Sequence, residues 1–248
     1  MIDSPENFHT KRSILFKVLN RLSMYKLEKF LDRRRILKYS SNQDQREFYI
    51  DWKTKSHNRI ALVNRLINSY SLNNDLRYLE IGCAGDKLFQ SVMVKTKVGV
   101  DPFAGGTLRM TSDKFFESNT DNFDVVFVDG LHEYHQAWRD IKNSLSIIPV
   151  GGYIGIHDML PRNWIEAHVP CLSNGPWSGD VWKIAFDLKE NPSIEFNLVN
   201  IDHGVGLIKK IKDDAASVLE STYHQKSYKF YAENRDKLPI IEFDELNL

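Results

Sequence analysis

Apolar residues recur every three or four positions in the first third of the chain. Over residues 13–38 this spacing, with Lys and Arg between the apolar positions, predicts one or two amphipathic helices. A polar stretch over residues 40–45 favours a loop, and an apolar stripe over residues 60–67 predicts a further helix that ends near Asn73. We therefore expect residues 1–70 to form a helical segment before the main domain. The apolar positions of the first stretch are Ile14, Leu15, Val18, Leu19, Leu22, Leu27 and Leu31.

After Leu76 the pattern changes to short β-branched runs separated by helical stripes. Such runs are typical of buried parallel strands joined by crossover helices. Only Asp202, His203 and Gly204 separate the last two runs, too few residues for a parallel crossover, so these strands should form an antiparallel pair at one edge. The pattern predicts a doubly wound α/β sheet, mostly parallel with an antiparallel last strand. The predicted strands are Tyr78–Ile81, Lys97–Val100, Val125–Val128, Tyr153–Ile156, Phe196–Ile201 and Val205–Lys209.

Composition narrows the class of protein. The 248 residues are 42% hydrophobic and 27% charged, values typical of a globular rather than a disordered protein. Two cysteines are too few for a disulfide framework, which favours a reducing compartment and a cytoplasmic location. The start of the chain lacks the pattern of a signal peptide, and no run of about 18 apolar residues predicts a membrane span.

Positive charge is concentrated in the N-terminal segment. Residues 1–70 contain 15 Lys and Arg against 7 Asp and Glu, a surplus of +8, so the remainder carries −8 because both totals are 33. A basic segment can contact an anionic membrane surface, nucleic acid or a phosphorylated substrate. It can equally be a solvated helical face that pairs with the acidic remainder. We find no recognition-helix, RNA-binding or zinc-finger motif, so nucleic acid is not an expected partner.

Residues directly after each strand are the candidates for ligand contact, because ligands of open α/β sheets bind at the carboxyl ends of the strands. The first strand runs into a turn with Gly82 and Gly85, where the backbone can approach a ligand closely. Asp101 follows the second strand about 20 residues later, where it could accept hydrogen bonds from a ribose diol. The dinucleotide fingerprint requires glycine at positions that Ala84 and Lys87 occupy, which disfavours a phosphate-binding turn.

Taken together, these motifs resemble the class I S-adenosylmethionine-dependent methyltransferases. Glu80-Ile-Gly82 and Asp101 match the start of the glycine turn and the acidic residue after the second strand in that family. Four further motifs are similar to a branch associated with sugar and polysaccharide modification, and to the macrolide-sugar O-methyltransferases. The resemblance covers residues 76–210 and implies a Rossmann-like core over residues 71–211, with residues 212–248 as a C-terminal extension. The further motifs are Thr111-Ser-Asp-Lys-Phe-Phe116, Asp124-Val-Val-Phe-Val-Asp-Gly-Leu-His132, Gly151-Gly-Tyr-Ile-Gly-Ile-His-Asp158 and Gly179-Asp-Val-Trp-Lys183.

The resemblance implies which residues contact the cofactor. S-adenosylmethionine has a ribose diol, an amino-acid end and a sulfonium but no phosphate, so its site needs carboxylates and close backbone approach. Ser112 and Asp113 would follow a short third strand beside the adenine, although a helix N-cap is an alternative role for Asp113. The cofactor-binding residues expected on this basis are Glu80, Gly82, Ala84, Gly85, Asp101, Ser112, Asp113 and Asp129.

Four polar side chains should converge at the ends of two neighbouring strands. Asp129 ends one predicted strand, His157 and Asp158 end the next, and His132 follows three residues after Asp129. Carboxylates with an imidazole favour Mg²⁺ or Mn²⁺ over zinc. The resemblance implies that Asp129 and Asp158 are metal ligands and His132 the general base, with His157 in place of an acidic ligand. The alternatives are a helix cap for Asp129 and hydrogen-bonded structural histidines.

The long loop over residues 159–183 is the candidate lid or substrate wall. Its aromatic faces suit a sugar ring, and we expect Trp177, Asp180 and Trp182 to contact the substrate. Alternatively, the tryptophans close the edge of the core. We therefore predict a metal-assisted O-methyltransferase for a sugar, nucleotide sugar or glycan. A phenolic or amide acceptor is the alternative, and a homo-oligomer is left open.

Overall fold

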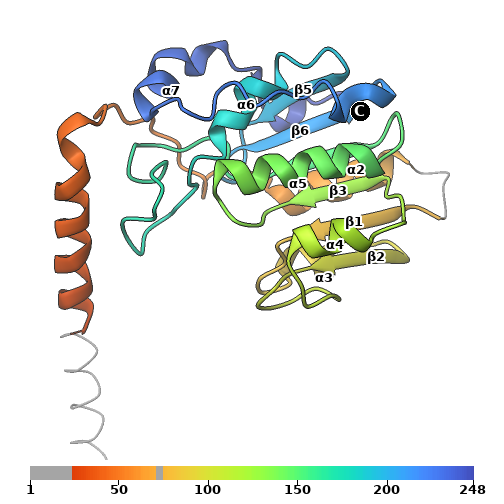
Figure 1. Cartoon of the computed structure of the whole chain (residues 1–248), viewed down its shortest axis with the longest axis horizontal. Helices are drawn as coiled ribbons and strands as arrows, with labels where there is room; N and C mark the ends of the chain where they lie inside the picture. The colour runs from red at the N-terminus through yellow and green to blue at the C-terminus, as the bar shows by residue number, and fades with distance from the viewer. Residues whose placement is uncertain (1–23, 71–74) are drawn as a thin grey trace, which may run out of the picture.

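A seven-stranded mixed sheet forms the centre of the molecule (Figure 1). The computed structural model describes residues 24–70 and 75–248. The strands are β1 Arg77–Ile81, β2 Thr96–Val100, β3 Val125–Val128, β4 Tyr153–Ile156, β5 Ile194–Val199, β6 Val205–Lys210 and β7 Ile240–Ile241. Their order is β2-β1-β3-β4-β6-β5-β7, and β6 is antiparallel to both neighbours while the other pairs are parallel. This topology confirms the predicted doubly wound, Rossmann-like α/β class.

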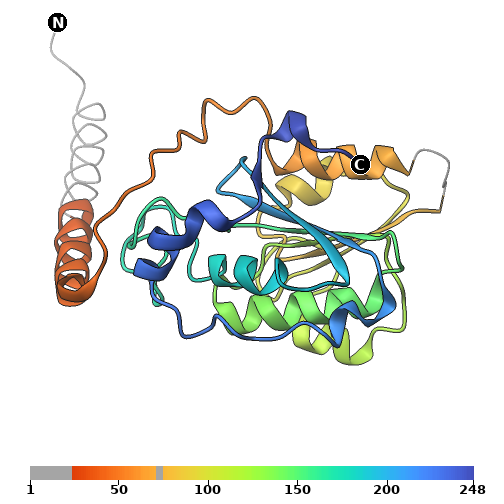
Figure 2. The same cartoon turned by 90° about the horizontal axis from the view of Figure 1, so that it is seen from above.

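Helices cover both faces of the sheet (Figure 2). Besides a helix over residues 24–39, the described helices are α2 Arg59–Ser69, α3 Lys87–Ser91, α4 Ser112–Ser118, α5 Tyr134–Ile147, α6 Trp182–Leu188 and α7 Tyr228–Asn234, with 3-10 turns η1 Ser40–Asn42, η2 Asp213–Ala216, η3 Arg235–Lys237 and η4 Phe243–Glu245. On one face α2 and α3 bury Leu62, Leu66 and Phe89. On the other face α5 and α6 bury Ile141 and Phe186. Successive strand residues point to opposite faces, so strands that are apolar throughout, such as β3 and β4, give both faces of the sheet apolar side chains.

Helix α2 belongs to the core, although the sequence analysis assigned it to the N-terminal segment. Its Leu62, Val63 and Leu66 are fully buried against the sheet. Asn58 caps the N-terminus of the helix, because its side chain accepts hydrogen bonds from backbone N–H groups of the first turn. The described residues 43–58 contain no helix, so the expectation of a helical segment throughout residues 1–70 is wrong there.

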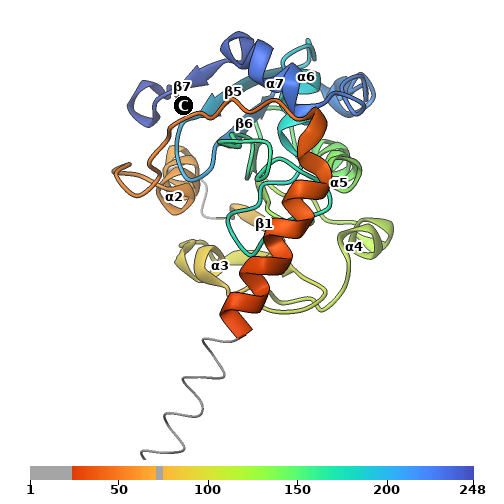
Figure 3. The same ribbon diagram turned by 90° about the vertical axis from the view of Figure 1, so that its left-hand side faces the viewer.

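The helix over residues 24–39 stands apart from the sheet (Figures 1 and 2) and crosses in front of it in the view of Figure 3. It meets the body through buried Asp32 and through Ile36, which packs against the core. Basic residues alternate with its exposed apolar side chains, a pattern that suits an anionic membrane surface. Contact with such a surface stays a prediction. None of the described helices is long and apolar enough to cross a membrane. The predicted apolar positions before Leu27 lie outside the described residues. The exposed apolar residues are Met24, Tyr25, Leu27, Phe30, Leu31 and Leu37.

Two details of the predicted sheet are wrong. The short third strand before Ser112 does not form, because Leu108 turns back to donate to the Gly99 carbonyl and makes only an isolated bridge with Val100. The antiparallel pair is not at the edge, because β7 of the C-terminal extension pairs with β5. Residues 212–248 therefore complete the sheet.

Candidate active site

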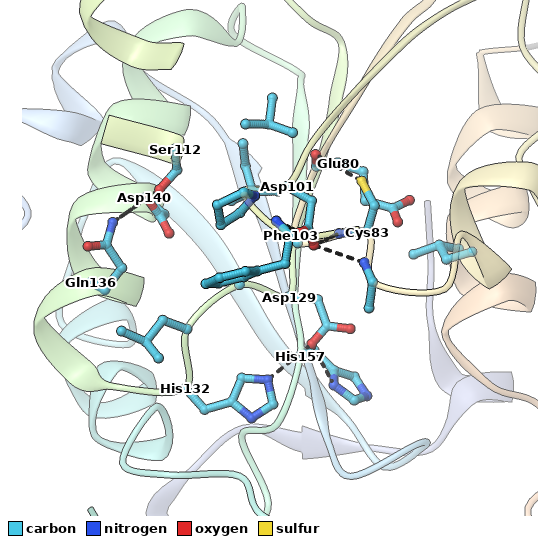
Figure 4. A pocket seen from close by; sticks show the side chains of 18 of the residues that line it. Glu80, Cys83, Asp101, Phe103, Ser112, Asp129, His132, Gln136, Asp140 and His157 are labelled. Atoms are coloured by element: carbon cyan, nitrogen blue, oxygen red, sulfur yellow. Dashed lines mark hydrogen bonds and ion pairs between the residues drawn. The ribbon is translucent and has the colours of Figure 1, made fainter. Parts of the chain in front are cut away.

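A cavity of 660 Å³ lies at the carboxyl ends of β1 to β4 (Figure 4). The chain passes from β1 to β2 on one side and then to β3 on the other, and such a switch point opens a crevice at the strand ends. The volume lies within the ~300–1,000 Å³ of small-molecule sites. None of the three predicted substrate residues is among the described residues that line it. The predicted residues in its wall are Glu80, Gly82, Ala84, Gly85, Asp101, Ser112, Asp113, Asp129, His132, His157 and Asp158.

The turn after β1 forms the floor of this pocket. Gly82 has a φ of +84°, and a Cβ atom there would lie 2.1 Å from the carbonyl oxygen of Asp129, so only glycine fits. Ala84 and Asp86 also adopt positive φ, which strains residues that carry a Cβ. The Asp86 carboxylate accepts a hydrogen bond from Gly106 N at 2.6 Å and so helps to hold the strained turn.

Asp101 ties the turn after β1 to the loop after β2. Its Oδ2 accepts hydrogen bonds from the backbone N–H groups of Cys83 and Ala84, and its Oδ1 from those of Phe103 and Ala104. Burial alone would raise the pKa of this carboxyl, but the four backbone donors hold it below its ordinary value. The carboxylate thus fixes the pocket wall, and contact with a ribose diol stays a prediction.

Ser112 and Asp113 lie on the opposite wall. The Thr111 side chain accepts from Lys114 N and caps α4, so the N-cap role considered for Asp113 is wrong. Asp113 instead pairs with Arg139 at 3.4 Å, and Gln136 Nε2 donates to it at 3.2 Å.

Asp140 is a pocket residue that the sequence analysis missed. It is 1% exposed, and Gln136 Nε2 donates to its Oδ1 at 3.0 Å. Its Oδ2 has no hydrogen-bond partner among the described residues. Burial raises the pKa of Asp140 to about 6. A buried, unpartnered carboxylate oxygen in a pocket wall suits a donor group on a ligand. A carboxylate on the buried face of an amphipathic helix was the available signal.

Glu80 is the most buried carboxylate of the floor. It is 2% exposed, and Tyr78 donates a hydrogen bond to its Oε2 at 2.6 Å. Burial raises the pKa of Glu80 to about 7, although the Tyr78 hydroxyl opposes this shift. The folded-state pKa therefore lies above the ordinary value of 4.5. The stability associated with the protonated form is full below that value and is lost as the pH rises through about 7.

Glu80→Gln should therefore stabilise the free protein only at high pH. The amide keeps an oxygen for the Tyr78 hydroxyl but carries no buried charge, so the free energy of unfolding should rise by about 2–3 kcal/mol near pH 8 and little near pH 5. Urea unfolding at both pH values measures the difference. An equal effect at the two pH values would contradict the raised pKa.

Asp129, His132, His157 and Asp158 form what we call the acid–histidine cluster. His132 Nε2 lies 3.5 Å from Asp129 Oδ1 and 3.3 Å from Asp158 Oδ2. His157 Nδ1 lies 3.1 Å and 3.0 Å from the same two oxygens. Both rings point toward Asp129 in Figure 4. Ligand atoms of Asp129, His132 and Asp158 all lie within 4.8 Å of one another, close enough to hold one metal ion.

The charges of this cluster support one another. Burial alone would raise the pKa of Asp129, but His157, His132 and Arg59 hold it well below its ordinary value. Burial alone would lower the pKa of His132, but the carboxylates of Asp129 and Asp158 raise it. The two carboxylates therefore attract positive charge, whether it is a proton on an imidazole or a metal ion.

Arg59 and Asp202 complete the site, and the sequence analysis missed both. Arg59 is the first residue of α2, and its Nη1 donates to Asp202 at 2.9 Å. The same Nη1 lies 3.2 Å from His157 Nε2. Burial alone would lower the pKa of His157, but the carboxylates of Asp129 and Asp158 beside its Nδ1 raise it well above its ordinary value. The charged His157 ring thus lies between these carboxylates and Asp202.

The loop over residues 159–183 orients His132 through its backbone. His132 Nδ1 lies 2.9 Å from the Trp177 carbonyl oxygen, which can only accept, so Nδ1 carries the hydrogen and Nε2 faces the carboxylates. Gly179 has a φ of +57°, and a Cβ atom there would lie 1.6 Å from the His132 carbonyl oxygen. Only glycine allows the loop to approach His132 so closely.

The predicted substrate residues have other contacts. Trp182 is 1% exposed and packs against Phe186 and Tyr231, so the core-closing alternative describes it. Asp180 accepts from the first backbone N–H of α5 and pairs with Lys183, so Asp180 rather than Asp129 caps that helix. Trp177 is partly exposed and its ring lies 5.3 Å from the His132 ring, so it is the one of the three beside the cluster.

Residues 79–159 match a methyltransferase domain. This stretch covers less than half of the chain, but it runs from within β1 past the end of β4 and contains the whole acid–histidine cluster. The match supports an S-adenosylmethionine-dependent methyltransferase. A search of curated proteins found no significant match.

Solved structures that are similar to this chain include several methyltransferases. One is MycE methyltransferase from the mycinamycin biosynthetic pathway with Mg, SAH and mycinamycin VI, at 19% identity over 61% of this chain and 49% of that chain, with a TM-score of 0.42. This chain thus spans about half the length of MycE. Others are an O-methyltransferase from Bacillus cereus with SAH (10% identity, 74% and 90% of the chains, TM-score 0.44) and a putative O-methyltransferase from Klebsiella pneumoniae (13%, 73% and 90%, 0.45).

Proposed function

We propose that this chain transfers the methyl group of S-adenosylmethionine to a hydroxyl of a sugar or glycan-linked acceptor, assisted by a divalent cation and by His132 as base. The observation that carries the proposal is the acid–histidine cluster in the wall of the pocket, whose lining residues other than Arg59 all lie within the methyltransferase-domain match. A hydroxyl is too weak an acid to react unaided near neutral pH, so a base beside carboxylates suits this acceptor. The choice of a sugar as the acceptor rests on the resemblance of the sequence motifs to those of sugar-modifying methyltransferases.

The chemistry of the pocket wall fits the cofactor. Glu80 and Asp140 place buried carboxylates at the pocket, suited to the cationic and amine groups of S-adenosylmethionine. The unpartnered Asp140 Oδ2 has room for one further hydrogen bond. The turn at Gly82 supplies close backbone approach. Asp101 would contact the ribose, together with the backbone of the turn after β1 and the loop after β2 that it holds in place.

The acid–histidine cluster fits Mg²⁺ or Mn²⁺. Asp129 and Asp158 offer carboxylate oxygens, which hard cations prefer, and His132 and His157 offer nitrogen atoms beside them. A cation bound there would lower the pKa of an acceptor hydroxyl nearby. We propose the two carboxylates as ligands and His157 as the residue that positions them.

His132 would accept the acceptor's proton. The Trp177 carbonyl keeps hydrogen on Nδ1, so Nε2, which faces Asp129 and Asp158, is the nitrogen that would take up the proton. As the acceptor oxygen bonds to the methyl carbon, the carbon–sulfur bond breaks, the hydroxyl proton moves to Nε2 and S-adenosylhomocysteine leaves. The pocket has then only to align oxygen, carbon and sulfur.

Calorimetric titration with S-adenosylmethionine tests the cofactor. We expect the wild type to bind and Asp101→Ala to bind about 2–10-fold more weakly, because a lost hydrogen bond is worth about 0.5–1.5 kcal/mol. Asp121→Ala removes an exposed carboxylate paired with Arg77, outside the pocket, and should bind like the wild type. Unchanged affinity in Asp101→Ala would exclude Asp101 from cofactor binding. Binding of a reduced nicotinamide dinucleotide in place of S-adenosylmethionine would overturn methyl transfer.

A further inference from the structure

A second cavity, of 280 Å³, adjoins the first pocket. Arg59, Lys87 and Leu88 line both cavities, so the two are neighbours along α2 and α3. Its volume is close to the lower limit of about 300 Å³ for small-molecule sites. It suits a compact group attached to a larger ligand.

The walls of the two cavities differ in charge. Carboxylates predominate among the charged residues of the first, whereas Asp202 is the one carboxylate among the described residues that line the second. Asp202 pairs with Arg59, and Lys55 pairs with Glu242 at 2.8 Å. Lys53 and Lys87 also line the second cavity, and no ion pair within the described residues neutralises either of them. Its basic side chains are Lys53, Lys55, Arg59 and Lys87.

Trp52 adds an uncharged donor to this wall. Its Nε1 is buried and has no hydrogen-bond partner among the described residues. Such a donor favours a ligand that brings an acceptor oxygen. Ammonium, guanidinium and N–H groups together suit an oxyanion with several oxygens, of which phosphate is the common biological example.

Arg59 connects the second cavity to the acid–histidine cluster. Its Nη1 contacts Asp202, while its Nε lies 3.9 Å from Asp129 Oδ2. A single guanidinium thus spans from the cavity wall to the proposed metal ligand. A ligand with a hydroxyl at the cluster could therefore reach the second cavity with another of its substituents.

We propose that the acceptor carries a phosphate or diphosphate and that this anion binds in the second cavity. The inference rests on the proposed methyl transfer and narrows its acceptor to an anionic sugar, such as a sugar phosphate or a nucleoside diphosphate sugar. The opposite charges of the two cavities then sort the two substrates, because the sulfonium favours the acidic pocket and the phosphate favours the basic one.

Titration of the whole protein with inorganic pyrophosphate tests the anion site directly. The double variant Lys53→Ala/Lys55→Ala should bind pyrophosphate at least about tenfold more weakly than the wild type, and the wild-type affinity should fall as salt is added. Lys87 is left in place because it lines both cavities. The control Lys95→Ala/Lys114→Ala removes the same charge from exposed positions and should bind like the wild type. Equal pyrophosphate affinity in the two double variants would overturn the proposal.

Turnover with a panel of acceptors identifies the source of the anion. Sugar 1-phosphates, nucleoside diphosphate sugars and neutral methyl glycosides are compared with the same S-adenosylmethionine. We expect methylation of a phosphorylated sugar, with KM raised and kcat little changed in Lys53→Ala/Lys55→Ala. Faster methylation of neutral glycosides would overturn the anionic acceptor while leaving methyl transfer intact. Failure to bind S-adenosylmethionine would overturn methyl transfer itself, so the two failures are distinguishable.

Discussion

Replacement of His132 by alanine should lower kcat about 10²–10⁴-fold, the usual contribution of a positioned general base. The Trp177 carbonyl holds hydrogen on Nδ1, so Nε2 is the nitrogen available on the pocket side, 3.3 Å from Asp158. Because the Glu80 floor and the Asp140 wall stay in place, the affinity for S-adenosylmethionine should be nearly unchanged. Steady-state methyl transfer and calorimetry on the same preparation measure both quantities.

Thermal unfolding and magnesium dependence of His132→Ala distinguish the other roles. A purely structural histidine would lower Tm and leave the rate per folded molecule intact. A metal ligand would let excess Mg²⁺ restore part of the lost rate. His135→Ala is the matched control, since this exposed histidine is the second residue of α5, three positions after His132, and is not part of the cluster. A near-wild-type kcat in folded His132→Ala would remove His132 from the mechanism.

The pocket could be predicted from the sequence because its residues follow strands that are easy to recognise. Asp101 and Asp129 come directly after strands and Asp158 one residue further on, and parallel strands bring such positions to one edge of the sheet. The spacing of His132 from Asp129 is likewise local. Eleven predicted residues therefore lie in one pocket wall.

Arg59 and Asp202 could not be predicted in this way, because their contact depends on how distant elements pack. They are separated by 143 residues and meet only once α2 lies on the sheet beside the turn between β5 and β6. In the sequence, Asp202 is one residue of a tight turn and Arg59 one of many basic residues before residue 70. Neither pattern distinguishes a site residue from a solvated charge.

Local composition also fails to decide which side of a loop faces the core. The aromatic content of residues 159–183 predicted a substrate wall, yet Trp182 begins a helix whose apolar face packs against α7 residues such as Tyr231. Asp180 is bound to the backbone of α5 and to Lys183. These outcomes depend on tertiary packing, which a polar or aromatic residue type does not specify.

Removal of divalent cations should lower the rate of methyl transfer about 10²-fold or more, and added Mg²⁺ should restore it. Asp129 and Asp158 face each other across two imidazole nitrogens, and a metal ion among them would contribute several kcal/mol to the stabilisation of developing charge. Exhaustive chelation followed by back-titration of Mg²⁺ measures the effect.

Thermal stability gives a readout of this site that is independent of turnover. A ligand that binds only the folded state adds ~2.7 kcal/mol at 100 times its Kd, so Mg²⁺ should raise Tm of the free protein. Asp158→Asn should lose this shift because it removes a charged oxygen from the cluster. Asp113 lines the same pocket away from the cluster, so Asp113→Asn should keep the rise in Tm that Mg²⁺ causes. Full activity after chelation, with a Tm that does not respond to Mg²⁺, would mean that the carboxylates act only by holding the two imidazole rings in place, and that His132 works without a cation.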